Sequence, residues 1–126
     1  MLVQRLLSFS DYADVNYRGT ANEQIENEDQ FQQMMKNSYK EPQLLLFYAD
    51  WCGHCTKLKP VWDTLVAQSN SKNLHKMNCS DRNSYANTKK DLFEGFPTIC
   101  RMYEGQPKTF QGNRTEGELE KFRIQG

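Results

Sequence analysis

The sequence of 126 residues has no excess of charge of either sign and no long apolar segment. Lysine and arginine together number 16, as do aspartate and glutamate, so the formal net charge is zero. No overall field therefore attracts nucleic acid or an anionic membrane surface. The longest apolar run, residues 44–49, is far shorter than the roughly 20 residues of a membrane-spanning helix. We expect neither nucleic-acid binding nor membrane insertion, and we expect partners to be recognised locally.

Cysteine is scarce as well. The chain has four cysteines, too few for a small secreted scaffold held together by disulfides. Its length allows one hydrophobic core without such cross-links. We expect one domain over residues 22–126, monomeric, preceded by an N-terminal extension of residues 1–21. The extension has no long periodicity, ends in a turn-like segment and can pack as a short helix.

A clear targeting signal is missing too. Residues 1–9 are mildly apolar, but Gln4 and Arg5 interrupt the stretch where a signal peptide needs a continuous apolar core. No retention tetrapeptide stands at Gln125-Gly126. These two absences favour the cytoplasm.

The most informative segment is Trp51-Cys52-Gly53-His54-Cys55, because two thiols separated by two residues can form a reversible dithiol–disulfide couple. The apolar run that leads into it is typical of a buried strand. Apolar positions at helical spacing follow it. The pair is therefore predicted at a strand-to-helix junction, where it favours thiol–disulfide exchange.

The predicted start of the helix distinguishes the two thiols. Backbone N–H groups are unsatisfied at a helix N-terminus, and together with the helix dipole they favour an anion. The thiolate form of Cys52 is therefore favoured. When His54 is protonated, its charge favours the same thiolate and stabilises the reduced pair relative to the disulfide. We expect Cys52 to be the nucleophile.

The rest of the chain alternates between helices and strands. Apolar spacing predicts a helix from residue 29 and, after Pro42, a strand over residues 43–49. Pro60 interrupts the helix after the cysteines and should kink it. Then follow a strand over residues 74–79, a helix over 83–93, a hairpin of 98–103 and 107–111, and a last helix with a capping box of Thr115 and Glu118.

Four segments resemble the thioredoxin superfamily, and within it the catalytic domains of protein disulfide isomerases. They are FYADWCGHC at residues 47–55, KLKP at 57–60, GFPTI at 95–99 and GNR at 112–114. The CGHC form of the motif is typical of the isomerases, whereas bacterial-type thioredoxins usually carry CGPC. The resemblance covers residues 22–124. It implies the thioredoxin fold, an α/β fold whose central mixed β-sheet is flanked by helices on both faces.

The resemblance also implies a substrate-binding surface. Pro97 matches a cis proline that faces the cysteine pair and shapes the substrate groove. The main chain around Phe96 and Pro97 could pair with an extended substrate segment, which implies broad substrate choice. Thr98 and Trp51 belong to the same expected surface, and the rings of Trp51 and Phe96 would present apolar area to unfolded substrates.

The expected catalytic set consists of Cys52, Gly53, His54, Cys55 and Arg114. Arg114 resembles a late arginine of the family that approaches the active site and lowers the pKa of the second cysteine. Here the segment GNR has one residue inserted relative to the commoner Gly-Arg form.

Two positions depart from the family pattern. Leu46 stands where the family usually has a buried acid that exchanges a proton with the second cysteine, and Thr56 stands where it often has lysine. Without the acid, deprotonation of Cys55 must rely on Arg114, water or the substrate. This predicts slower escape from mixed disulfides.

These residues predict a thiol–disulfide oxidoreductase, similar to protein disulfide isomerase, that acts on protein thiols and disulfides and needs no cofactor. A redox partner, either a reductase, glutathione or an oxidase, would reset the pair. The resemblance implies an endoplasmic reticulum-type lumen, against the cytoplasm favoured above. Two alternatives stay open: a cytosolic thioredoxin-like reductase, and a weakly catalytic peptide-binding or chaperone module, which Leu46 favours.

Other uses of the cysteines are less favoured. The motif cysteines with Cys79 or Cys100 and a histidine could supply four zinc ligands, but neither later cysteine belongs to a second C-x-x-C. We therefore expect no metal. Thr56 after the pair excludes covalent haem attachment, and a static disulfide remains the simplest alternative. Cys79 and Cys100 are expected as small buried side chains, and His75 as a packed or surface residue.

Overall fold

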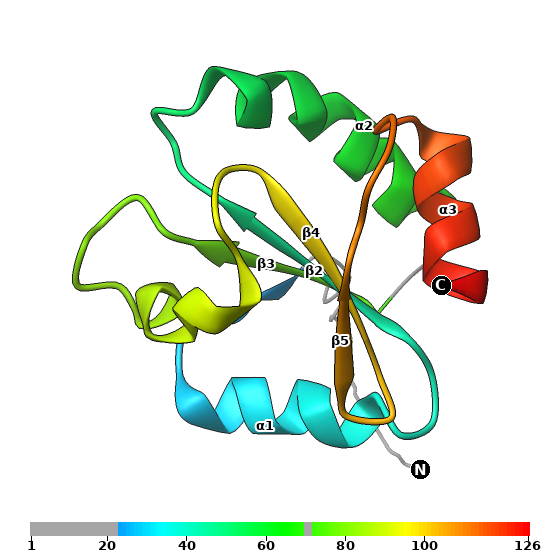
Figure 1. The fold of residues 1–126 in the computed structure, drawn as a ribbon, viewed down its shortest axis with the longest axis horizontal. Helices are drawn as coiled ribbons and strands as arrows, with labels where there is room; N and C mark the ends of the chain where they lie inside the picture. Colours follow the sequence, from blue (N-terminus) through cyan, green and yellow to red (C-terminus); the bar gives the residue numbers. More distant parts are fainter. Residues whose placement is uncertain (1–22, 70–71) are drawn as a thin grey trace, which may run out of the picture.

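The structure, a computed structural model, describes residues 23–69 and 72–126, which contain a five-stranded mixed sheet (Figure 1). The strands are β1 (Glu23–Gln24), β2 (Gln43–Tyr48), β3 (Leu74–Asn78), β4 (Thr98–Tyr103) and β5 (Gln106–Thr109). They lie in the order β1-β3-β2-β4-β5. β1 and β2 run parallel to β3, β4 runs antiparallel to β2, and β5 runs antiparallel to β4. The extension predicted at residues 1–21, with its short helix, lies outside the described residues.

Helices cover both faces of this sheet (Figure 1). α1 (Glu28–Asn37) lies on one face, and α2 (Gly53–Ser69) and α3 (Glu116–Gln125) lie on the other. Side chains of β2 alternate between the two cores: Leu45 and Phe47 pack on the α1 face, and Leu44 and Leu46 pack with Trp62 on the other face. A strand covered on both sides is apolar throughout, which explains the run at residues 44–49. The predicted thioredoxin fold is confirmed.

Local sequence signals set several boundaries. Asn27 begins α1, because its side chain accepts a backbone N–H of the first turn at 2.9 Å. Thr115 begins α3 in the same way, accepting the Glu118 N–H at 3.2 Å as the capping pattern predicts. The hairpin turns at Glu104 and Gly105, which both have positive φ. Such a two-residue turn matches the twist of the paired strands.

The helix predicted over residues 83–93 differs in type. It is a 3-10 helix, η2 (Tyr85–Leu92), in which Lys89 leaves the helical region of φ and ψ. The Thr88 hydroxyl donates to the carbonyl of Tyr85, and the Asn87 amide donates to that of Asp81. These local bonds compete with the α-helical ladder and favour the tighter turn.

Two strands also differ in detail from the prediction. β5 ends at Thr109 rather than at residue 111. β1 has two residues, too few to produce a periodic pattern, and was not predicted. α2 agrees with the prediction of one long helix, since its 17 residues continue through Pro60. None of the helices in the described part of the chain is long and apolar enough to cross a membrane.

Candidate active site

The cysteine pair lies where the sequence predicts it, between the end of β2 and the start of α2. α2 begins at Gly53, so Cys52 occupies the N-cap position. The Cys55 N–H donates to the Cys52 sulfur at 3.2 Å. The sulfur thus takes the place of the side-chain oxygen that usually caps a helix, and it receives an N–H that has no acceptor inside the helix. The two cysteines are in contact and are free thiols.

The loop before β4 approaches the same sulfur. The peptide bond between Phe96 and Pro97 is cis, as the resemblance implies. The Cys52 thiol lies 3.6 Å from the carbonyl oxygen of Phe96. The Thr98 hydroxyl turns back into its own loop and donates to the Gly95 carbonyl at 2.6 Å. Phe96 and Pro97 therefore lie next to Cys52. The Thr98 hydroxyl instead makes a hydrogen bond within the cis-proline loop.

A series of aromatic rings connects the site with the core. Trp51 is 69% exposed and meets Phe96 edge-on, with ring centroids 5.7 Å apart. Phe96 contacts Phe93 at 5.4 Å, and Phe93 stacks on the buried Phe47 at 4.8 Å. The ring of Trp51 thus lies on the surface beside Cys52, and Phe96 and Phe93 connect it to the core.

Cys55 is held mainly in its thiol form. Burial raises the pKa of Cys55, and the hydrogen bond with Cys52 raises it further. A backbone hydrogen bond at Ala49 and, more weakly, the positive charge of Arg114 lower the pKa of Cys55. Arg114 is exposed in the segment between β5 and α3. The charge of Arg114 lowers the pKa of Cys55, which is the effect that the resemblance implies.

Leu46, which stands where the family usually has a buried acid, lines the same cavity as Cys55. This cavity has a volume of about 300 Å³, and its wall also includes Lys76 and Asp63. Leu46 is 5% exposed and pairs with Lys76 across β2 and β3. The cavity thus combines an apolar side chain, in place of the acid, with charged groups farther out.

Gly53 and His54 make up the rest of the motif. Both are exposed in the first turn of α2. A Cβ built on Gly53 meets no other atom within 4 Å. The structure therefore gives no steric reason for glycine at this position, and the side chain of His54 is free to reach solvent beside Cys52.

The remaining cysteines and His75 lie away from the site. Cys79 and Cys100 are 5% and 1% exposed in the α1-side core, and burial raises the pKa of each thiol to about 11. His75 is 5% exposed, and burial lowers its pKa to about 4. In the part of the chain that the structure describes, no three histidine, cysteine or acidic side chains come together to hold a metal ion.

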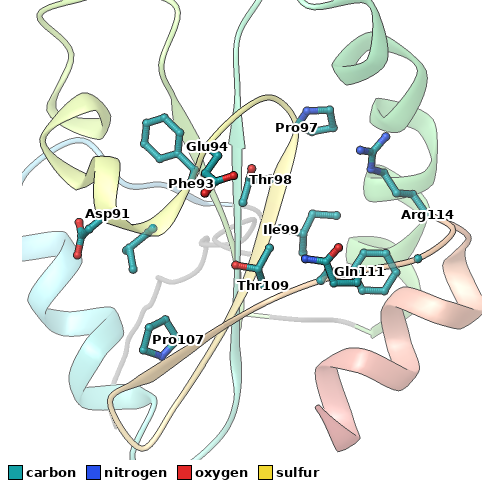
Figure 2. Close-up of a pocket in the computed structure, with 13 residues that line it drawn as sticks. Asp91, Phe93, Glu94, Pro97, Thr98, Ile99, Pro107, Thr109, Gln111 and Arg114 are labelled. Atoms are coloured by element: carbon teal, nitrogen blue, oxygen red, sulfur yellow. The ribbon is translucent and has the colours of Figure 1, made fainter.

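A larger cavity, of about 490 Å³, begins at the cis-proline loop (Figure 2). Its wall includes Pro97 and Thr98 from this loop, Asp91 and Glu94 from the end of η2 and the residues after it, and Arg114. Asp91 and Glu94 could not be identified from the sequence, because isolated acidic residues form no motif. We call it the cis-proline cavity.

The five-stranded mixed sheet, its helices on both faces, and a thiol pair at the N-terminus of α2 beside a cis proline define a thioredoxin-type domain. Comparison with known sequences agrees with this geometry. The profile of the family described as Thioredoxin matches residues 22–125, and the chain belongs to this family.

The relatives include protein disulfide isomerases. The chain is 39% identical over 84 residues to Protein disulfide-isomerase of Humicola insolens, covering 63% of this chain and 16% of that protein. It is 30% identical over 105 residues to Thioredoxin domain-containing protein 5 homolog of Drosophila melanogaster, covering 79% of this chain and 24% of that protein. The chain therefore spans less than a quarter of the length of each relative.

A solved structure supports the same assignment. The first thioredoxin domain of mouse Protein disulfide-isomerase A4 superposes with a TM-score of 0.63 at 27% identity, covering 79% of this chain and 71% of that one. Full-length ERdj5 superposes with a TM-score of 0.68 at 16% identity, covering 82% of this chain and 16% of that one, which shows the shared fold.

Proposed function

We propose that the chain is a thiol–disulfide oxidoreductase of the protein disulfide isomerase type, which acts on polypeptide thiols and disulfides through Cys52 and Cys55. One observation carries the proposal: the Cys52 sulfur caps α2, accepts the Cys55 N–H at 3.2 Å, and lies 3.6 Å from the Phe96 carbonyl. The positive end of the helix favours a thiolate at this sulfur.

In the proposed reaction, the Cys52 thiolate attacks one sulfur of a substrate disulfide. A bond forms between Cys52 and that sulfur, and the other substrate sulfur leaves as a thiolate. Cys55 then loses its proton and attacks the Cys52 sulfur. This step forms the Cys52–Cys55 disulfide and releases the second substrate thiolate. The reverse sequence oxidises a substrate, and repeated attack and release by Cys52 isomerises one.

The surroundings of the pair fit a polypeptide substrate. The exposed ring of Trp51 and the half-buried ring of Phe96 offer apolar area beside the sulfur. The main chain at Phe96 and Pro97 is close enough to Cys52 to pair with an extended segment bound to it. Contacts of this kind do not depend on the substrate sequence, so we infer a broad choice of proteins.

Replacement of Cys52 tests whether redox chemistry is the function. We expect Cys52→Ser to abolish the reactivation of a disulfide-scrambled protein, and Cys55→Ser to accumulate a mixed disulfide with it. Cys79→Ala is the matched control and should remain active, because that thiol is buried away from the pair. If Cys52→Ser assists refolding as well as the parent chain does, the redox mechanism is wrong and the binding or chaperone module takes its place.

The reduction potential separates the isomerase from a thioredoxin-like reductase. The pair would be titrated in glutathione buffers and its redox state read by thiol alkylation. A value of about −180 mV is typical of protein disulfide isomerase, and one of about −270 mV is typical of thioredoxin. We expect the former, because the charge of a protonated His54 stabilises the reduced pair.

A further inference from the structure

The cis-proline cavity lies next to the sulfur that would hold a substrate. Phe96, whose carbonyl is 3.6 Å from the Cys52 sulfur, is bonded to Pro97, which lines the cavity. A polypeptide joined to Cys52 and lying across Pro97 would therefore pass its neighbouring residues over this cavity. The volume of about 490 Å³ falls within the range of roughly 300–1,000 Å³ typical of ligand pockets.

The two ends of the cavity differ in charge. Figure 2 shows Asp91 and Glu94 on the side of the η2 segment and Arg114 on the opposite side, beyond Gln111. Asp91 and Glu94 are exposed, and no ion pair of the described residues uses either carboxylate. Lys90, the neighbour of Asp91 in the sequence, does not line the cavity.

The charge of Asp91 acts inside the fold. Burial raises the pKa of Cys100, and the negative charge of Asp91 raises it further, although the two residues belong to different elements. Arg114 acts in another direction, since its charge lowers the pKa of Cys55. Arg114 lies at the opposite side of the cavity (Figure 2), so the η2 end is lined by the two carboxylates Asp91 and Glu94.

Resting on the proposed function, we propose that the cis-proline cavity is a specificity subsite that takes a lysine or arginine side chain of the polypeptide held on Cys52. Asp91 and Glu94 would bind its charged end, and Pro97, Phe93 and Ile99 would contact its aliphatic stem. The main chain at the cis proline binds substrates without regard to sequence, and these two carboxylates add a preference for basic residues near the reacting cysteine.

Two synthetic peptides test the proposal. Each has one cysteine activated as a mixed disulfide with thionitrobenzoate, flanked by lysine in one peptide and by glutamine in the other. The Cys52 thiolate attacks the peptide sulfur, the bond to thionitrobenzoate breaks, and the coloured thiolate that leaves reports the rate. Because exposed charge pairs are weak, we expect the lysine peptide to react about fivefold faster, which corresponds to about 1 kcal/mol in total.

Matched variants assign the preference to the cavity. Asp91→Asn with Glu94→Gln should bring the two peptide rates to within about twofold of each other, with the rate for the glutamine peptide unchanged. The control, Asp29→Asn with Glu104→Gln, removes two exposed carboxylates outside the cavity and should keep the preference. An unchanged preference in the first variant, or an equal loss in both, overturns the proposal.

A small neutral disulfide separates this inference from the proposed function. If hydroxyethyl disulfide oxidises the pair at the same rate in the parent and in the Asp91→Asn, Glu94→Gln variant while the peptide preference is lost, the subsite is supported. If Cys52 reacts with this disulfide but shows no preference between the peptides, the subsite is overturned and the function stands. If Cys52 reacts with none of them, both are overturned.

Discussion

Protonation of His75 should destabilise the folded chain as the pH falls. The Gln43 amide N–H donates to the Glu41 carbonyl and to Asn73 Oδ1, both at 3.1 Å, which fixes the orientation of the amide. Gln43 Oε1 lies 2.8 Å from His75 Nε2, so Nε2 carries the proton and donates. Nδ1 is buried and has no hydrogen-bond partner among the residues that the structure describes. Protonation would place a charged N–H there with no acceptor.

The magnitude follows from the pKa. Burial lowers the pKa of His75 from 6.5 to about 4. A group with a lowered pKa in the folded state contributes stability that is present above the unfolded pKa and is lost as the pH falls through the folded one. The difference between 6.5 and about 4 corresponds to about 3 kcal/mol. The free energy of unfolding should therefore fall by about 1.4 kcal/mol per pH unit between these values.

The assay compares urea unfolding of the parent chain and of His75→Gln from about pH 7 to about pH 4. Carboxylates titrate in the same range. The pKa values of Glu28 and Glu120 are lowered by hydrogen bonds from Tyr85 and Arg123. These contributions are the same in both proteins, so they cancel when the free energy of unfolding of His75→Gln is subtracted from that of the parent chain. We expect this difference to fall by about 3 kcal/mol from the upper to the lower end of the pH range.

A matched histidine variant completes the test. His54→Gln removes an exposed imidazole and should leave the steep pH dependence in place. The refuting result is a difference in the free energy of unfolding between the parent and His75→Gln that is the same at both ends of the pH range. Burial of His75 would then not keep its imidazole neutral in the folded state.

Three further predictions concern the active site and a helix cap. Leu46→Glu should accelerate attack by Cys55 on a mixed disulfide at least about tenfold, because it supplies a base beside the thiol, whereas Leu46→Gln should not; rapid-quench alkylation measures this rate. Arg114→Gln should raise the pKa of Cys55 and slow the same step, and Arg114→Lys should largely restore it, as the pH–rate profile would show. Thr115→Ala should cost about 1 kcal/mol in urea unfolding, since it removes the acceptor of the Glu118 N–H; an unchanged midpoint would contradict the capping role.

Most of the fold follows from local patterns in the sequence. The apolar run of β2 and the Thr115 cap each depend on neighbouring residues, and both elements lie where those residues predict them. η2 could not be assigned correctly from apolar spacing, because the bonds of Asn87 and Thr88 to nearby carbonyls decide its type. β1 is defined by pairing with a distant strand and has no pattern of its own.

Some residues of the candidate site could be predicted from short sequence segments, and others come together only in the folded chain. The cysteine pair at the start of α2 is encoded in one short segment, and Pro97 lies in a second recognisable one. The cis-proline cavity instead combines residues from η2, β4, β5 and the segment before α3. Asp91 and Glu94 acquire a shared environment only when these elements pack together, so no local pattern in the sequence could single them out.

The two tryptophans of the described chain differ in exposure, and this difference provides an optical readout. Trp51 is 69% exposed beside Cys52 and touches Phe96, whereas Trp62 is 1% exposed in the core on the α2 face. A polypeptide that covers the site would change the emission of Trp51 and its quenching by iodide, while Trp62 would remain a constant background. Trp51→Phe isolates that background. Occupancy of the active site can therefore be followed in solution by the intrinsic fluorescence of the protein, without any attached label.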